Sequence, residues 1–316
     1  MDDGSTPPAI MVLGNGPAVC RDDRIRIFRH AKNKGTHSAR RTGVLASRGR
    51  WILFLDADDT LAPAALETIA GRLRIAPDDL DMLRFGVTIR NKPENSETRM
   101  PILENGRTCL ARVFPRRAGV FGPICSGTYR GAICRRAFSR MEDIRLVYGE
   151  DSYELFAIAA LSSGIEVLPA ACYEYDRTET GVTGWQRNRT DLMAYYRSFL
   201  LATQERLASF SATVRFVESL SGDEGKAARR AMWRRRKVLL LAMFPFETSF
   251  LRAQGIPLIR ILGDLKPALS TISRRDRFLF LAGQIARVWR ERLRLAPRRA
   301  KTSWLTTTQV DHAGTD

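Results

Sequence analysis

The stretch WILFLDADDTL, residues 51–61, constrains the fold more than any other part of the chain. Residues 51–55 form an uninterrupted apolar run, which is typical of a β-strand that is covered on both faces. The run ends in Asp56, Asp58 and Asp59, three carboxylates within four positions. Because like charges this close repel one another, the pattern predicts a cationic partner beside them.

Apolar runs and helical stretches alternate through the first part of the chain, which predicts an α/β fold with a mainly parallel sheet flanked by helices. After about residue 190 the pattern becomes helical and basic. We therefore expect a first domain over residues 1–190 and a basic helical region over residues 191–316, with a frayed tail at its end. The segments behind this prediction are strands at 24–28, 51–55 and 81–89 and helices at 36–47, 61–74 and 152–164.

Positive charge is concentrated in the second half. Residues 191–316 hold 23 Lys and Arg against 11 Asp and Glu, whereas residues 1–190 hold 28 against 23. An imbalance of this kind indicates an anionic partner for the C-terminal part, namely a membrane surface, nucleic acid or a phosphorylated substrate. Arginines on the solvated face of a packed helical subdomain are the alternative explanation.

The cysteine spacing and the hydropathy pattern argue against a zinc site and against a membrane-spanning helix. The five cysteines are scattered and form no CxxC pair, so the sequence argues against a zinc site and favours reduced thiols. No apolar run approaches the ~18 residues that a membrane-spanning helix needs. His30 and His37 belong to no metal-ligand spacing, and we expect both at the surface.

Asp56 stands at the carboxyl end of its predicted strand, where open α/β sheets bind ligands. Asp56 and Asp58 flank one residue, so a tight turn can bring both carboxylates to Mg²⁺ or Mn²⁺. Helix capping by Asp58 and Asp59 is the alternative. Two enzyme classes use such a pattern. "DADDTL" matches the D-x-D-x-T-L signature of haloacid-dehalogenase-type phosphatases, with Asp56 as the nucleophile and Asp58 as general acid/base.

The same residues also resemble the D-x-D segment of family 2 glycosyltransferases, and three other segments share that resemblance in the family's order. "DDGST" at residues 2–6 resembles the end of its V-D-D-G-S-T-D strand. Residues 33–59 resemble N-x-G-x-S-x-A-R-N-x-G followed by the A-x-G-x-[YW]-I-x-F-L-D-A-D-D segment. "GED" at residues 149–151 resembles a motif at a helix start, and residues 173–184 resemble the end of the catalytic domain.

This resemblance implies a GT-A-like fold and an inverting transfer from a nucleotide-diphosphate sugar to a hydroxyl of a glycan or lipid-linked acceptor, in cell-surface polysaccharide synthesis. A divalent metal on Asp58 and Asp56 would neutralise the leaving diphosphate. Asp151 is the candidate base and Glu150 its close rival. The other implied donor contacts are Asp2, Asp3, Arg40, Asp56 and Arg177.

Such enzymes often act on lipid-linked acceptors, so we expect a cytoplasmic protein held peripherally on the inner face of the plasma membrane; nucleic acid is not favoured as a partner. The family has a strand and a helix before D-D-G-S-T, whereas this chain starts at Met1. We therefore expect an N-terminally truncated chain whose natural form carries an upstream apolar strand. A degenerate homologue that only binds a glycan or a partner is the non-enzyme alternative.

Overall fold

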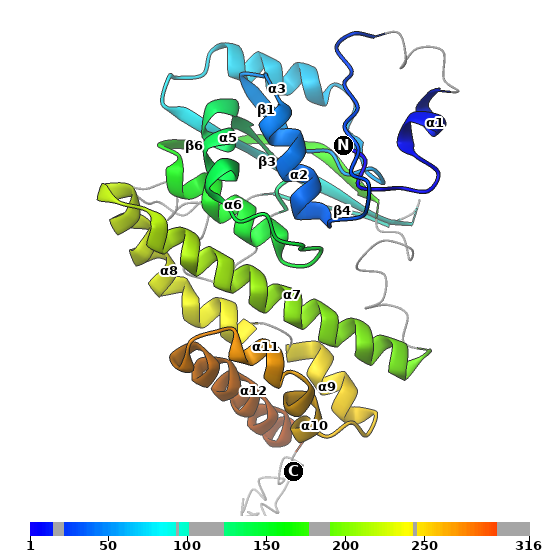
Figure 1. Cartoon of the computed structure of the whole chain (residues 1–316), viewed down its shortest axis with the longest axis vertical. Helices are drawn as coiled ribbons and strands as arrows, with labels where there is room; N and C mark the ends of the chain where they lie inside the picture. The colour runs from blue at the N-terminus through cyan, green and yellow to red at the C-terminus, as the bar shows by residue number, and fades with distance from the viewer. Residues whose placement is uncertain (15–21, 93–94, 101–122, 177–189, 243–244, 296–316) are drawn as a thin grey trace, which may run out of the picture.

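The structure is a computed structural model of the 316-residue chain. It describes residues 1–14, 22–92, 95–100, 123–176, 190–242 and 245–295. Figure 1 shows an α/β part formed by the first half of the chain, followed by a stack of helices formed by the second half.

Six strands form one sheet in the order β1-β5-β3-β6-β2, with β4 paired to β3. The long strands β3 and β6 form its centre and run parallel to each other. The strand bounds are β1 (Trp51–Leu53), β2 (Thr60–Leu61), β3 (Leu80–Lys92), β4 (Asn95–Arg99), β5 (Gly127–Arg130) and β6 (Gly164–Asp176).

The predicted α/β architecture is confirmed, but the described strands form a mixed sheet rather than a mainly parallel one. Four of their pairs are antiparallel: β1 with β5, β2 with β6, and β3 with both β4 and β5. The prediction was wrong on this point because an apolar run reports burial, not the direction of the neighbouring strand. β1 lies at one end of the strand order and its residues are only half-buried.

The segment at residues 24–28 is not a strand, although its residues alternate in hydropathy. Only Arg29, just beyond it, pairs with Asp2, in an isolated parallel bridge. Ile25 and Phe28 are exposed. A single bridge does not make a continuous strand ladder. The apolar side chains of this segment therefore have no sheet face to pack against among the described residues.

Helices α2, α5 and α6 pack together on the α/β part, and α7 lies against α6 (Figure 1). The predicted helix at 36–47 is confirmed as α2 (Thr36–Ala46), and that at 152–164 begins earlier, as α6 (Glu150–Leu161). The other helices are α1 (Ala9–Gly14), α3 (Ala65–Arg74), α5 (Gly131–Arg140), α7 (Leu192–Ser219), α8 (Gly222–Ala242), α9 (Pro245–Ala253), α10 (Leu258–Asp264), α11 (Lys266–Ser270) and α12 (Arg274–Leu295).

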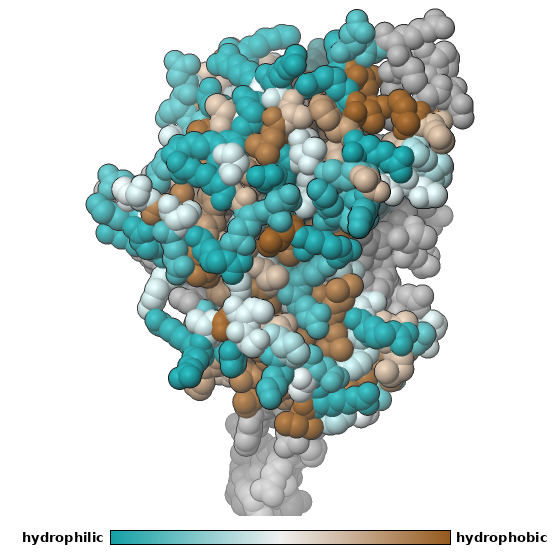
Figure 2. Space-filling view, in the orientation of Figure 1, coloured by the Kyte–Doolittle hydropathy of each residue, from teal (hydrophilic) through white to brown (hydrophobic). Residues whose placement is uncertain are grey.

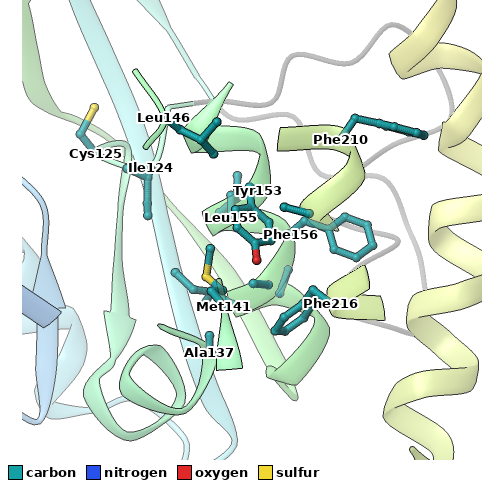
Figure 3. Close-up of a cluster of buried hydrophobic side chains, with 14 of the residues drawn as sticks. Ile124, Cys125, Ala137, Met141, Leu146, Tyr153, Leu155, Phe156, Phe210 and Phe216 are labelled. Carbon is teal, nitrogen blue, oxygen red and sulfur yellow. The ribbon is translucent and has the colours of Figure 1, made fainter. Parts of the chain in front are cut away.

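Helix α6 is the centre of the core. All its residues from Tyr153 to Leu161 are buried, as expected of a helix that is apolar on every side. Figure 3 shows Phe210 and Phe216 of α7 beside Tyr153 and Phe156 of α6, and the Tyr153 and Phe216 rings meet edge-on with centroids 6.4 Å apart. The C-terminal helices therefore share the core that holds the N-terminal end of α6.

On the face seen in Figure 2, hydrophobic residues gather in small patches among hydrophilic ones. One such patch lies over α1, which exposes Ile10, Met11 and Val12. Within the described ranges, none of the helices is long and apolar enough to cross a bilayer.

Candidate functional site

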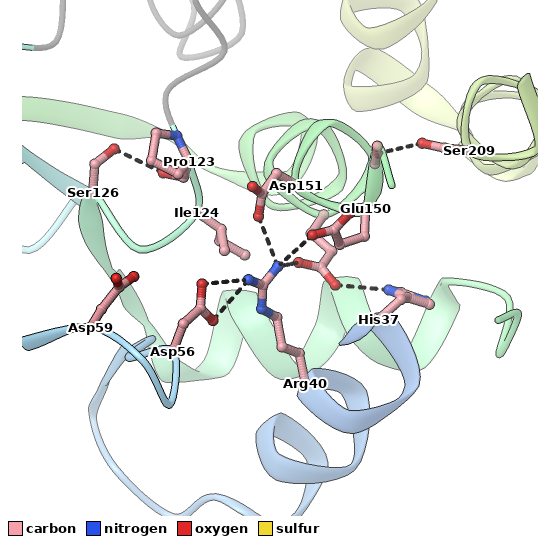
Figure 4. A network of polar contacts seen from close by, with 12 residues as sticks. His37, Arg40, Asp56, Asp59, Pro123, Ile124, Ser126, Glu150, Asp151 and Ser209 are labelled. Atoms are coloured by element: carbon pink, nitrogen blue, oxygen red, sulfur yellow. Dashed lines mark hydrogen bonds and ion pairs between the residues drawn. The ribbon is translucent and has the colours of Figure 1, made fainter. Parts of the chain in front are cut away.

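The guanidinium group of Arg40 is the centre of the site, and four carboxylates surround it (Figure 4). Its Nη2 donates to both carboxylate oxygens of Asp56, at 3.0 and 3.2 Å. Its Nη1 donates to Asp151 at 2.8 Å and to Glu154 at 3.0 Å, and lies 3.6 Å from Glu150. Arg40 is thus the cationic partner that the acids of residues 56–59 predicted, although we expected it at the nucleotide.

Three separate elements supply this cluster. Arg40 comes from α2, Asp56 from the loop after β1, and the other three acids from the first turns of α6. Gly149 precedes α6 with a φ of 81°, a left-handed conformation that glycine adopts without strain. Negative charge at a helix N-terminus is favoured by the helix dipole, so α6 is a suitable place for Glu150 and Asp151.

The site holds more negative charge than Arg40 can balance. Burial, and then the charge of Asp151, raise the pKa of Glu150 well above its usual value. Burial also raises the pKa of Asp151, against the opposing effect of Arg40. The Asp151 side chain is still 35% exposed and that of Asp56 37%, whereas that of Glu150 is 12% exposed. Asp151 therefore combines a raised pKa with access to solvent, as a general base requires.

The turn after β1 gives its three acids different environments. Asp59 is buried, accepts the Tyr173 hydroxyl at 2.6 Å, and accepts the backbone N–H of Asp176 at 2.9 Å. Burial raises its pKa, whereas these two hydrogen bonds lower it. Asp59 therefore ties the turn to β6 and does not cap α3. Asp58 is exposed, and no hydrogen bond or ion pair joins its carboxylate to another described residue.

Asp2 and Asp3, predicted to contact the nucleotide, make hydrogen bonds within the protein. The backbone N–H groups of Ser5 and Ala9 donate to Asp2 and lower its pKa to about 2. Asp3 accepts the backbone N–H groups of Lys34 and Gly35 and contacts Nδ1 of His30 at 2.6 Å. Asp3 therefore orders the start of α2. Its role toward a nucleotide stays a prediction, as does that of Arg177, which lies outside the described residues.

The donor set after β1 suits a hard divalent cation, because Asp56 and Asp58 offer only carboxylate oxygens. Within the described ranges, no group of three or more His, Cys, Asp or Glu side chains is arranged to hold a metal. Cys125, Cys134 and Cys172 are buried free thiols, as the sequence predicted.

Sequence reasoning missed Glu154 and misplaced His37. We expected His37 at the surface, but its side chain is fully buried and its Nδ1 lies 2.9 Å from a carboxylate oxygen of the equally buried Glu154. His30 is also largely buried, with 10% of its side chain exposed. The signal for Glu154 was available: it is the single charged residue in the otherwise apolar stretch of α6 that follows Ser152.

Helix α7 holds the loop that leads to the acids of α6. The Glu205 carboxylate accepts the backbone N–H groups of Val147 and Tyr148, at 2.7 and 2.9 Å. The Ser209 hydroxyl donates to the carbonyl oxygen of Gly149 at 2.6 Å (Figure 4). The first helix after residue 190 therefore helps to shape the site.

Comparison with known proteins points to the same family as the motifs. Residues 1–135 match the model of "Glycosyl transferase family 2". The N-terminal part of this chain is therefore similar to that family, in agreement with its motifs. The matched residues include Arg40 and Asp56, whereas the acids of α6 lie beyond them.

Two curated proteins are similar to the chain. The succinoglycan biosynthesis protein ExoO of Rhizobium meliloti is 31% identical over 176 residues, which are 52% of this chain and 49% of that protein. An uncharacterized glycosyltransferase of Haemophilus influenzae is 37% identical over 67 residues, 21% of this chain and 26% of that one. The chain thus spans about half the length of ExoO.

Among solved structures, S. aureus TarS residues 1–349 in complex with UDP-GlcNAc aligns with 92% of this chain and 81% of its own, at 14% identity and a TM-score of 0.48. The corresponding TarS structure in complex with UDP covers 92% of this chain and 80% of its own, at 14% identity and a TM-score of 0.45.

Proposed function

We propose that this chain transfers a sugar, with inversion, from a nucleotide-diphosphate donor to a hydroxyl of a glycan or lipid-linked acceptor in the synthesis of a cell-surface polysaccharide. The observation that carries the proposal is the Arg40 cluster, in which one guanidinium joins the Asp56 carboxylate of the D-x-D turn to Asp151 at the start of α6. A donor bound at the turn would thus lie near a solvent-accessible acid. The similarity to ExoO, a succinoglycan biosynthesis protein, supports the polysaccharide context.

In this reaction Asp58 and Asp56 would hold Mg²⁺ or Mn²⁺. Once bound, the metal would neutralise the charge that develops on the departing nucleoside diphosphate. Asp58 suits this role because its carboxylate is exposed and uses no described protein group as a partner. Arg40 keeps the Asp56 carboxylate oriented through both of its oxygens.

Asp151 would take the proton of the acceptor hydroxyl. Its raised pKa makes it a stronger base than an ordinary carboxylate, and its exposed part is open to an acceptor. Glu150 is the weaker candidate because its side chain is more buried, 12% exposed against 35% for Asp151.

The phosphatase alternative is not favoured. The family match of residues 1–135 points to sugar transfer rather than phosphate hydrolysis.

The test is a donor screen with UDP-, GDP- and dTDP-sugars in the presence of Mn²⁺. A cognate donor at ~100 times its dissociation constant adds ~2.7 kcal/mol to the unfolding free energy, which thermal shift detects. Release of nucleoside diphosphate then measures turnover. Hydrolysis of simple phosphoesters without any donor binding would revive the phosphatase. Donor binding without turnover against candidate acceptors would support a binder.

We further propose that the helical region contacts an anionic membrane surface. Trp233 of α8 is 63% exposed, and the Arg275 guanidinium of α12 lies 5.4 Å from its ring centroid. Phe278, one turn further along α12, is 70% exposed. Exposed aromatic side chains interleaved with arginines suit the interface of an anionic bilayer.

Sedimentation of the full chain with phosphatidylglycerol vesicles measures this association. Binding should fall with added salt, because surface charge attraction is screened, and with the double substitution Trp233→Ala and Phe278→Ala. Phosphatidylcholine vesicles are the neutral control. Absent binding, or binding that salt does not weaken, would favour arginines on a merely solvated face.

A further inference from the structure

A second contact, between the fully buried side chains of His37 and Glu154, lies behind the Arg40 cluster. His37 precedes Arg40 by one turn of α2, and Glu154 follows Asp151 by one turn of α6. The two helices therefore meet through two adjacent contacts, His37 with Glu154 and Arg40 with both Glu154 and Asp151. Figure 4 shows His37 on the side of the cluster away from Asp56.

Hydrogen-bond partners assign the protons of His37. Its Nε2 lies 3.0 Å from the carbonyl oxygen of Glu142. A carbonyl oxygen only accepts, so Nε2 carries a proton and donates it. Its Nδ1 lies 2.9 Å from a Glu154 oxygen. A hydrogen bond between these two atoms needs a second proton, carried either by Nδ1 or by the carboxyl oxygen. The other Glu154 oxygen accepts from Arg40 at 3.0 Å, which favours the carboxylate and leaves the proton on His37.

The surroundings hold the imidazole ring in this orientation. The Phe138 ring stacks on it with centroids 6.0 Å apart, and the Tyr153 ring lies at 5.4 Å on a tilted plane. The Tyr153 hydroxyl accepts the backbone N–H of Glu142, the residue whose carbonyl receives Nε2 of His37. Rotation of the ring would break its own contacts with Glu142 and Glu154.

We propose that His37 is held as an imidazolium and that the His37–Glu154 pair is a positioning unit for the sugar-transfer site, resting on the function proposed above. Glu154 anchors Nη1 of Arg40, so that Nη2 faces Asp56 and the first turn of α6 stays in register with the D-x-D turn. His37 supplies the positive charge that lets Glu154 remain ionised while buried. Neither residue touches the donor or the acceptor.

The substitution Glu154→Gln separates charge from shape. The glutamine carbonyl can accept from Arg40 while its amide donates to Nδ1 of a neutral His37, so every hydrogen bond is kept and the negative charge is lost. We expect kcat to fall by about 10-fold or more, because small misplacements of reacting groups cost up to ~10²-fold, while the KM for the donor stays nearly unchanged. His37→Gln, a second variant, should lower kcat in the same way.

Glu142→Gln is the matched control. It neutralises a nearby acid that pairs with the exposed Arg215, but it leaves the Glu142 carbonyl and hence the His37 contact in place. We expect wild-type kcat and KM for this variant. A kcat of Glu154→Gln equal to that of the control would overturn the positioning role.

Nuclear magnetic resonance tests the protonation without any substrate. The chain has three histidines, and with ¹⁵N-labelled histidine the His37 signals are those lost in His37→Gln. We expect both ring nitrogens of His37 to be protonated in the wild-type chain at neutral pH and Nδ1 to lose its proton in Glu154→Gln. A neutral His37 in the wild-type chain would overturn the proposal. Because this measurement needs no turnover, its failure is distinct from a failure to find a sugar donor.

Discussion

Removal of the Arg40 charge should destabilise the chain by an amount that depends on pH. In Arg40→Met the side chain keeps a similar length but loses the guanidinium group that faces four carboxylates. The Arg40 side chain is only 10% exposed, and its partners Glu150 and Glu154 are buried as well, so water can hardly replace the guanidinium beside these two carboxylates. Breaking a buried ion pair from one side costs about 3–5 kcal/mol.

This cost can be read as a shift in unfolding temperature. With an unfolding entropy of about 2.1 cal/mol/K per residue, the unfolding temperature of a chain of 316 residues falls by about 4.5–7.5 °C for that range. The loss should be larger at pH 8 than at pH 5. Arg40 lowers the pKa values of Glu150 and Asp151, so without it both rise further. When the pKa of a carboxylate is higher in the folded than in the unfolded state, the protein loses stability as pH rises from the unfolded pKa through the folded pKa.

Scanning calorimetry at pH 5 and pH 8 is the assay, and Arg41→Met is the matched control. Arg41 lies on the same helix, but its guanidinium donates to the carbonyl oxygen of Phe138; losing one hydrogen bond costs about 1 kcal/mol, with no dependence on the titration of the acids. The reasoning is refuted if Arg40→Met costs no more than Arg41→Met, or if its cost is the same at both pH values.

Three further predictions concern single acids. Glu150→Gln should raise the unfolding temperature at pH 8 and have no effect near pH 4, because burial disfavours the charge that it removes; a uniform shift across pH would contradict this. Asp151→Asn should keep donor affinity within a few-fold, by calorimetric titration, while transfer falls by ~10²-fold or more; loss of donor binding would make Asp151 a donor contact. Asp58→Asn should leave the unfolding temperature unchanged, since the residue is exposed, but abolish Mn²⁺-dependent donor binding; wild-type activity would remove Asp58 from the metal site.

Local sequence patterns predicted the parts of the fold that local physics decides. The helix over residues 36–47 could be predicted because its apolar and polar positions follow the helical period, and the structure has it as α2. The sheet was less predictable. The apolar run at residues 51–55 correctly indicates a strand, but the antiparallel pairing of β1 with β5 joins residues far apart in the chain, and hydropathy carries no information on strand direction.

The same limit applies to the site. Repulsion among Asp56, Asp58 and Asp59 predicted a cation, and Arg40 is that cation for Asp56. Hydropathy and spacing could not identify this cation, because Arg40 lies on the preceding helix, 16 positions from Asp56, and meets it only in the folded chain. His37 was placed at the surface for a related reason: a lone histidine is polar, and the buried carboxylate that accepts it lies 117 positions away.

The charges of the cluster connect the site to the stability of the whole chain. Asp56, Glu150, Asp151 and Glu154 face Arg40, and with His37 protonated the cluster still has two negative charges more than positive ones when all four acids are ionised. Burial, and then this excess of negative charge, raise the pKa values of Glu150 and Asp151, and any cation that binds beside Asp56 would stabilise the folded state. The acids that would serve a metal and an acceptor are therefore the same ones that the bare protein holds at an electrostatic cost, and α6 tolerates them because its remaining turns are buried in the core on every side.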